Sequence, residues 1–429
     1  VDTVGIFQFE SDGMKGFLRN LQVLSFDDIV SAIALYRPGP RDNIDSFIKR
    51  RKGVQKVTYV HESLEPILKS TYGIIIYQEQ IIEILKKIGG FTYSEADTIR
   101  RAMSKKKENI ILEYQMLFIE NAINQGIDRQ IATDIYDLII KFASYGFNKS
   151  HSVAYSLVSY QIAYLKAHYK NYFITEELNI AIDSSIKTKE YIDEARANNI
   201  NISNVSINQS KEQYYVIENT IVLPFNIIKN IGTEVTKDIV KERKENGKYK
   251  DIYDTISRLA KIKVNKTIVQ SLILSGAFDE FGYNKNTIML NLENLYNYAE
   301  LVKDLDETLV MKPEIAVYKE YSNQELMKHE FELYGFYLKN HPVTKYKREG
   351  LCRLDNVKTY FDKHITVIGL IENIKEIKTK NNKMMAFILI SDEYSKLSVV
   401  VFPTTYENFN TQKIGDIIKV SGKIERRMN

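Results

Sequence analysis

The sequence predicts a multidomain, mainly α-helical protein that ends in an all-β domain with the pattern of an oligonucleotide-binding (OB) barrel. Its 429 residues are enough for about three domains of about 150 residues each. Apolar residues recur three or four positions apart through most of residues 1–175, as they do in helices that bury one face. From His364 onward, short apolar and β-branched runs alternate with turn residues, which is typical of antiparallel strands.

Composition excludes several other classes of protein. Apolar residues make up 44% of the chain and charged residues 27%, which is the balance of a core-forming protein rather than a disordered or collagen-like one. No apolar run approaches the about 20 residues of a transmembrane helix, and the first residues lack the pattern of a secretory signal. The single cysteine, Cys352, excludes a disulfide framework and a cysteine-based zinc site. We therefore expect a cytoplasmic protein.

Six segments carry the helical pattern most clearly. They are 64–68, 81–88, 96–103, 110–124, 129–142 and 152–168. Glycine- and proline-containing breaks separate them, and the apolar run Gly73–Tyr77 has the length of a strand. Short alternating runs within 198–222 predict small strands, and helices return after Pro224. A polar, charge-rich stretch from Leu290 to Glu332 is expected to be a partly helical connector.

A basic cluster lies in the segment TIRRAMSKKK. Its cations are Arg100, Arg101, Lys105, Lys106 and Lys107. If the helix continues through the segment, Arg101 and Lys105 lie one turn apart on one face. The net charge of the chain is only +4, so a case for phosphate binding depends on such local clusters. A solvated basic helix face explains this cluster equally well.

A second cluster surrounds the glycine-containing bend in YGFNKSHS. Its residues are Tyr145, Phe147, Asn148, Lys149, Ser150, His151 and Ser152. A helix is expected to begin here with Ser150 or Ser152 as its N-cap, and its free backbone N–H groups would help Lys149 to attract an anion. Aromatic rings beside Lys and His suit base stacking and phosphate contact. The alternative is a capped helix start with Tyr145 and Phe147 packed in the core.

Two further motifs invite a functional interpretation. In ALYRPGP, prolines on both sides of Gly39 fix a rigid turn that holds Arg37 in place. In IIIYQEQ, Glu79 follows an apolar run, but it has no partner carboxylate or histidine nearby in the sequence. One such glutamate is weak evidence for acid–base catalysis. Structural roles are therefore favoured for Gln78, Glu79 and Gln80.

The second half of the chain has two patterns that indicate nucleic-acid binding. The segment NIIKNIGTEVTKDIVKERKENG has the form of a helix–hairpin–helix, in which backbone N–H groups after Ile231 and Gly232 would hold a DNA phosphate. A related unit follows around Gly276. The residues expected to contact duplex DNA are Lys229, Gly232, Lys237, Lys241 and Gly276.

The strands after His364 suit an OB barrel with a basic hairpin between its first two strands. The lysines of this hairpin are Lys375, Lys378, Lys380 and Lys383. They are expected to bind single-stranded DNA, because the bases must be exposed to stack on the barrel. An all-β accessory domain of another kind is the alternative.

Seven motifs occur in an order and spacing that resembles one known family. They are RPGP, TYGIIIYQEQ, RRAMSKKK, YGFNKSHS, SYQIAYLKAHY, LSGAFDEFG and GFYLKNHP. Together they resemble the bacterial replicative DNA polymerase III alpha subunit of the DnaE type, over essentially the whole chain. The resemblance implies five domains. They are a fingers core at 1–175, a fingers extension at 176–225, a tandem helix–hairpin–helix at 226–285, a helical connector at 286–345 and an incomplete OB-fold domain at 346–429.

The resemblance also implies a function. The chain is expected to bind the incoming deoxynucleoside triphosphate (dNTP) and primer–template DNA during template-directed DNA synthesis. The residues implied in nucleotide binding are Arg100, Arg101, Lys105, Tyr145, Asn148, Lys149 and His151. Lys106 and Lys107 are implied in contacts with the DNA backbone. The other expected partners are replisome subunits, including the sliding clamp, although 301–314 lacks the family's glutamine-initiated clamp peptide.

The catalytic part of such a polymerase is expected to lie outside this chain. The family's palm carboxylates hold two Mg²⁺ ions, and the palm precedes the matching region, so no catalytic or metal-binding residue is assigned here. Asp2 is not embedded in an apolar strand motif. We therefore expect a fragment that does not extend a primer by itself. The rival hypothesis is a non-catalytic repair or scaffold module, which explains only the second half of the chain and requires no nucleotide binding.

Overall fold

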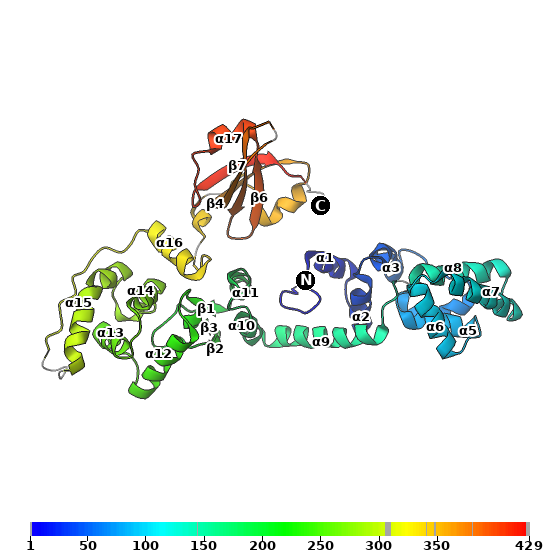
Figure 1. Cartoon of the computed structure of the whole chain (residues 1–429), viewed down its shortest axis with the longest axis horizontal. Coiled ribbons are helices and arrows are strands. Elements are labelled where there is room, and N and C mark those ends of the chain that lie inside the picture. Colours follow the sequence, from blue (N-terminus) through cyan, green and yellow to red (C-terminus); the bar gives the residue numbers. More distant parts are fainter. Residues whose placement is uncertain are drawn as a thin grey trace. The chain divides into compact units, whose positions relative to one another are not determined.

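The computed structural model describes residues 2–143, 145–304, 310–339, 341–346, 349–379 and 381–425. The chain divides into two compact units, Val1–Lys170 and Asn171–Asn429, and each is described by itself. Figure 1 shows that helices build the first unit and that the second combines helices with a curled sheet. Among the described residues, no helix is both long enough and apolar enough to cross a membrane.

The first unit begins with three helices that enclose one hydrophobic core. They are α1 (Asp12–Leu21), α2 (Phe26–Leu35) and α3 (Ile44–Arg51). Ser25 and Asp28 form a capping box at the start of α2. Asp28 also accepts two hydrogen bonds from Arg51, at 2.7 Å from Nε and 2.6 Å from Nη2. Burial alone would raise the pKa of Asp28, but the bonds from Arg51 and from two backbone amides outweigh burial and lower it.

The other helices of the first unit enclose a second core, which includes Ile81, Ile99, Phe118 and Tyr136. They are α4 (Glu65–Leu68), α5 (Gln78–Lys87), α6 (Tyr93–Ser104), α7 (Glu108–Asn124) and α8 (Arg129–Ala143). Together with α9, they confirm all six predicted helical segments. The expectation of a strand at Gly73–Tyr77 is wrong, because within it only Tyr77 pairs, through a single parallel bridge to Phe147.

Helix α9 (Lys149–His168) packs against α2 through a face of small residues. Ser152 and Ser159 are buried, and their hydroxyls donate to the carbonyl oxygens of Val30 (2.7 Å) and Phe7 (2.8 Å). Near the end of α9, the buried Lys166 binds the Asp2 carboxylate at 2.6 Å. The N-terminal segment is thereby fastened along α9.

The second unit starts with a helical part that carries a small sheet. Its helices are α10 (Lys170–Ile180, beginning at the unit boundary), α11 (Ser185–Ala197), α12 (Thr233–Asn246), α13 (Ile252–Lys261), α14 (Lys266–Ser275), α15 (Lys285–Asp304) and α16 (Asn323–Tyr334). The sheet has the order β1-β3-β2, from β1 (Asn201–Ile202), β2 (Tyr215–Ile217) and β3 (Thr220–Val222). The small strands predicted within 198–222 are confirmed, and the described part of 290–332 is partly helical as predicted.

The C-terminal sheet is antiparallel, with the order β6-β5-β4-β7. Its strands are β4 (His364–Lys378), β5 (Met384–Ser391), β6 (Lys396–Val401) and β7 (Ile417–Lys423), with α17 (Pro403–Phe409) between the last two. Ile371, Ile388, Ile390 and Phe409 contribute to its core. The sheet curls into a half-barrel consistent with an OB fold. The predicted fold class, helical domains followed by an OB-type β domain, is confirmed.

Candidate nucleotide and DNA interface

Two motifs that are 70 residues apart in the sequence meet at the bend before α9. The backbone N–H of Phe147 donates to the Ile76 carbonyl at 2.9 Å, and that of Gln78 donates to the Phe147 carbonyl at 2.9 Å. The Gln78 side chain donates to the Gly146 carbonyl, also at 2.9 Å. IIIYQEQ therefore fixes the backbone of YGFN from one side.

The RPGP turn supports the same bend from another side. Gly39 has a φ of +95°, and a Cβ atom there would lie 2.3 Å from Cδ1 of the Tyr145 ring. Only glycine allows this approach without displacing the ring. The Arg37 guanidinium lies 4.6 Å from the centre of the Phe147 ring, which is a cation–π contact. The turn thus supports both aromatic residues of the YGFN motif.

A hollow of about 710 Å³, which we call the polar hollow, opens beside this bend. It is lined by Gln8, Glu10, Ser11, Met14, Ile33, Tyr36, Arg37, Phe147, His151 and Tyr155. An aromatic row forms one wall. The ring centres of Phe147 and His151 lie 5.5 Å apart, and those of His151 and Tyr155 lie 4.0 Å apart. Aromatic faces beside a guanidinium and a carboxylate suit a ligand that has both a flat ring and polar groups.

The start of α9 differs from the sequence prediction. Its N-cap is Asn148, whose Oδ1 accepts a bond from the His151 N–H at 2.8 Å, so the expectation of Ser150 or Ser152 as N-cap is wrong. Both carboxylate oxygens of Glu79 lie 3.0 Å from the Lys149 backbone nitrogen. Asn148 and Glu79 therefore occupy the N–H groups of His151 and Lys149, so the expectation that the terminal N–H groups are free to attract an anion is wrong for these two.

Gln78, Glu79 and Gln80 have structural roles, as the sequence predicted. Gln80 accepts bonds from the N–H groups of Ile76 and Tyr77 at 2.9 and 3.0 Å, and Gln78 and Glu79 hold the bend before α9. Burial raises the pKa of Tyr77 to about 12, although its hydrogen bond with Ser31 acts in the opposite direction. Tyr77 therefore stays neutral at physiological pH.

The basic cluster does not form one helix face. Helix α6 ends at Ser104, and the N–H of its C-cap, Lys105, donates to the Arg101 carbonyl at 3.0 Å, so Arg101 and Lys105 lie one turn apart as predicted. Lys106, with a φ of +53°, and Lys107 lie beyond the helix. Arg100 and Arg101 both pair with Asp97, at 2.8 Å each. The hydrogen bond from Arg100 lowers the pKa of Asp97. Neither arginine lines the polar hollow, and their role in nucleotide binding stays a prediction.

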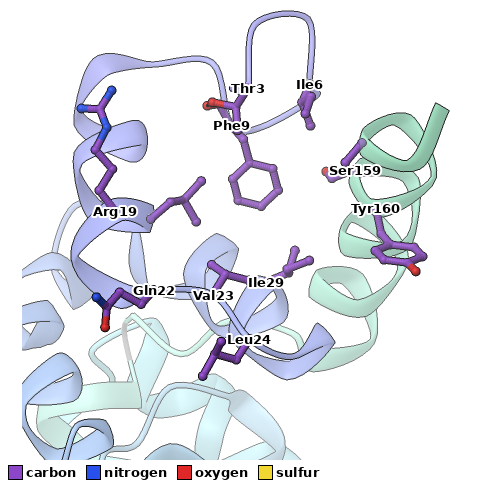
Figure 2. A pocket seen from close by; sticks show the side chains of 12 residues that line it. Thr3, Ile6, Phe9, Arg19, Gln22, Val23, Leu24, Ile29, Ser159 and Tyr160 are labelled. Carbon is purple, nitrogen blue, oxygen red and sulfur yellow. The ribbon is translucent and has the colours of Figure 1, made fainter. Parts of the chain in front are cut away.

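A second hollow, about 520 Å³ in volume, lies between the N-terminal segment, α1, α2 and α9. Figure 2 shows Phe9, Val23 and Ile29 around its interior, with Tyr160 at one side. Two hydroxyl groups on its wall are already satisfied, because Thr3 donates to the Phe9 carbonyl and Ser159 to the Phe7 carbonyl, at 2.8 Å each. This apolar hollow offers little to a nucleotide.

In the second unit, the start of α12 is open. Gly232 is its N-cap, no side chain caps the helix, and no atom lies within 4 Å of the place where a Cβ would be. Lys229, Lys237 and Lys241 are exposed. Gly276, unlike Gly232, is not open to a ligand. It is buried at the C-cap of α14, and its N–H already donates to the Ile273 carbonyl.

The basic hairpin lies between β4 and β5, where the sequence placed it. Lys375, Lys378 and Lys383 are exposed, and Thr379 and Lys383 close the turn through a backbone bond of 2.8 Å. Lys380, the fourth predicted lysine, lies outside the described residues. The proposed contacts of these lysines with DNA stay predictions.

Three protein-family models match the chain. They describe the bacterial DNA polymerase III alpha subunit finger domain (residues 1–126), a helix–hairpin–helix motif (199–288) and an OB-fold nucleic acid binding domain (365–429). Curated relatives named DNA polymerase III subunit alpha match almost the full chain. The protein of Staphylococcus epidermidis is 41% identical over 99% of this chain. This chain belongs to the bacterial DNA polymerase III alpha subunit family.

Other DNA polymerase III alpha subunits give similar values. Those of Borreliella burgdorferi and Bacillus subtilis are 38% and 37% identical over 98% and 100% of this chain. The chain spans about 40% of the length of the curated relatives it matches. It therefore corresponds to a segment of the alpha subunit that carries nucleic-acid-binding domains.

Sequence analysis did not assign several residues that line the polar hollow. These are Gln8, Glu10, Tyr36, Arg37 and Tyr155. Arg37 lies in the RPGP motif, and the rigid turn predicted there could have identified it as a candidate site residue. Gln8 and Glu10 lie in FQFES, and nothing in that segment alone indicates that it faces α9. Within the described residues, no three His, Cys, Asp or Glu side chains form a group that fits a metal ion.

Proposed function

We propose that this segment binds the incoming dNTP and primer–template DNA for a template-directed DNA polymerase in the cytoplasm. The observation that carries the proposal is the convergence of RPGP, IIIYQEQ and YGFNKSH on the bend before α9, from which Arg37, Phe147 and His151 line the polar hollow. In an alpha-subunit family member, a hollow with an aromatic row and a guanidinium fits a nucleotide. Membership of the family by itself does not locate the nucleotide.

Within this proposal, the base and sugar of the dNTP lie against Phe147, His151 and Tyr155. Tyr145, Asn148 and Lys149 border the nascent base pair at the bend. Arg100, Arg101 and Lys105 provide cations for the triphosphate from the end of α6, and Lys106 and Lys107 meet the DNA backbone.

The second unit holds DNA in this proposal. The open N-terminus of α12, with its exposed lysines, binds a duplex phosphate, since helix N-termini favour anions. Gly276 is not needed, because its N–H is already bonded. The β4–β5 hairpin binds a single strand. Mg²⁺ would be held by palm carboxylates of the longer polymerase, and the residues described here do not form a site for it. The sliding clamp and other replisome subunits remain proposed partners.

The proposal is tested by single-nucleotide incorporation with the longer polymerase that contains this segment. Base–aromatic stacking contributes about 1–3 kcal/mol, and about 1.4 kcal/mol corresponds to a tenfold change. We expect His151→Ala to raise KM for the dNTP about tenfold. His168→Ala is the matched control, because His168 stacks on Tyr164 at the other end of α9 with a ring distance of 4.3 Å. Equal KM values for both variants would contradict the proposal.

The rival repair or scaffold function predicts a different result. A scaffold has no use for a dNTP, so the chain would bind DNA but show no saturable dNTP binding. Titration of the purified 429-residue chain with a dNTP separates the two hypotheses.

A further inference from the structure

We propose that Arg37 contacts the phosphates of the nucleotide in the polar hollow. This inference rests on the proposed function of the hollow and adds a residue that neither the motifs nor the family models assign. Arg37 is exposed and lines the hollow together with Phe147 and His151.

The surroundings of Arg37 hold its backbone in place. Its N–H donates to the Leu35 carbonyl at 2.8 Å, and its own carbonyl accepts from the Arg41 N–H at 3.1 Å. Pro38 and Pro40 restrict the turn that follows. Its guanidinium lies over the Phe147 ring at 4.6 Å. A side chain fixed in this way loses little rotamer freedom when it meets a ligand.

The guanidinium of Arg37 has no acidic partner in the described part of the chain. Three other arginines near the first unit's motifs pair with carboxylates, and a fourth stacks on an aromatic residue that lines the hollow. Arg51 pairs with Asp28, Arg100 and Arg101 pair with Asp97, and Arg41 lies over the Tyr36 ring at 4.3 Å. Glu10 is the acidic residue that lines the hollow, and its carboxylate accepts a bond from the Gly5 N–H at 2.9 Å. Arg37 is thus the arginine that lines the hollow with its charge unneutralised.

The chemistry of the guanidinium fits a phosphate. Its flat face can rest on an aromatic ring while the N–H groups at its edge stay free to donate. Paired N–H donors match two oxygens of a phosphate, and such charge-assisted bonds are stronger than neutral ones. A lysine ammonium cannot stack and donate in this bidentate way. The aromatic row would hold the base, and Arg37 would hold the charged end of the same ligand.

The test is calorimetric titration of the 429-residue chain with dATP and, separately, with deoxyadenosine, in buffer without divalent metal. We expect Arg37→Gln to weaken dATP binding about tenfold and to leave deoxyadenosine binding unchanged, because only dATP carries phosphates. Arg37→Lys should weaken dATP binding less. Arg19→Gln, which removes an exposed arginine that lines the apolar hollow instead, should change neither affinity.

Each outcome has a distinct meaning. If the unmodified chain binds neither ligand, the proposed function of the hollow fails. If it binds dATP and Arg37→Gln binds equally well, the proposed function stands and the inference about Arg37 fails. Equal losses for dATP and deoxyadenosine would show that Arg37 only supports Phe147, which also overturns the inference. Should Arg37→Gln lower the thermal unfolding temperature markedly, Arg37→Lys provides the same comparison between the two ligands.

Discussion

The two helix starts that the sequence marks as phosphate sites are built in opposite ways. At the start of α9, the Asn148 side chain accepts a hydrogen bond from the His151 N–H, and the Glu79 carboxylate accepts one from the Lys149 N–H. At the start of α12, Gly232 provides no cap and its surroundings are open. Both helices have the partial positive charge of an N-terminus, and α12 has Glu234 in its first turn, but only at α9 do side chains of the chain itself accept hydrogen bonds from the terminal N–H groups. The first site therefore stabilises the fold, and the second remains available to a ligand.

The largest expected effect is the loss of stability when the Glu79 carboxylate at the start of α9 is removed. Glu79→Ala removes a charged acceptor from the Lys149 N–H, and hydrogen bonds to charged groups contribute about 1.5–3 kcal/mol. We expect the free energy of unfolding of the first unit to fall by about that amount in a urea titration. Glu83→Ala is the control, because Glu83 is half-exposed and pairs with Lys86 on the surface of α5. A similar loss in both variants would contradict the structural role of Glu79.

The next effect concerns the cap of α9. Replacing an asparagine N-cap by alanine costs about 1 kcal/mol. Asn148→Ala should reduce stability by about that amount, whereas Ser150→Ala should leave it nearly unchanged because Ser150 is not the cap. The measurement is thermal unfolding followed by circular dichroism. A greater loss of stability for Ser150→Ala than for Asn148→Ala would instead support Ser150 as the N-cap.

At α12, one substitution should move stability and DNA affinity in opposite directions. Gly232 has a φ of −80°, which any residue adopts, and there is room for a side chain. Gly232→Asp should stabilise α12 by a few tenths of a kcal/mol, because aspartate caps and complements the helix dipole. It should weaken duplex binding in a fluorescence-anisotropy titration, since its carboxylate repels phosphate. Gly232→Ser should weaken binding less. Unchanged affinity in Gly232→Asp would exclude this helix start from the DNA interface.

The smallest effects are those of single lysines on the salt dependence of binding. Each duplex phosphate contact contributes about −0.9 to the slope of log K against log salt concentration, and each single-strand contact about −0.7. Lys237→Gln and Lys241→Gln should each reduce the slope for duplex DNA, and Lys383→Gln should reduce that for a single strand. Lys328→Gln, on α16, serves as the control. Identical slopes in all variants would contradict the assignment of these lysines.

The sequence predicted regular elements better than contacts between distant segments. Helix periodicity located α5 to α9, and alternation located β4 to β7, because both patterns follow from which side chains are buried. The cap of α9 was assigned incorrectly because Asn148, Ser150 and Ser152 are all suitable capping residues by type. The position of Glu79 was not predictable, since it depends on a fold that brings residues 70 positions apart together.

At the candidate site too, the sequence predicted the local motifs but not the contacts between distant segments. The YGFN and RPGP motifs could be found in the sequence, because clustered aromatic, proline and glycine residues are unusual. Their convergence at one hollow required the packing of Tyr145 on Gly39 and of Phe147 beside Ile76. The residues of the basic cluster do not by themselves reveal that α6 ends at Ser104, so the sequence could not show that Lys106 and Lys107 lie beyond the helix.

Photo-crosslinking tests most directly whether the polar hollow binds the incoming nucleotide. The 429-residue chain would be irradiated with 8-azido-dATP, which carries its reactive group on the base, and labelled peptides would be located by mass spectrometry. We expect label in residues 145–155, and competition by unlabelled dATP should remove it. Label confined to the end of α6 around Arg100, or label that unlabelled dATP does not displace, would contradict the assignment of the polar hollow.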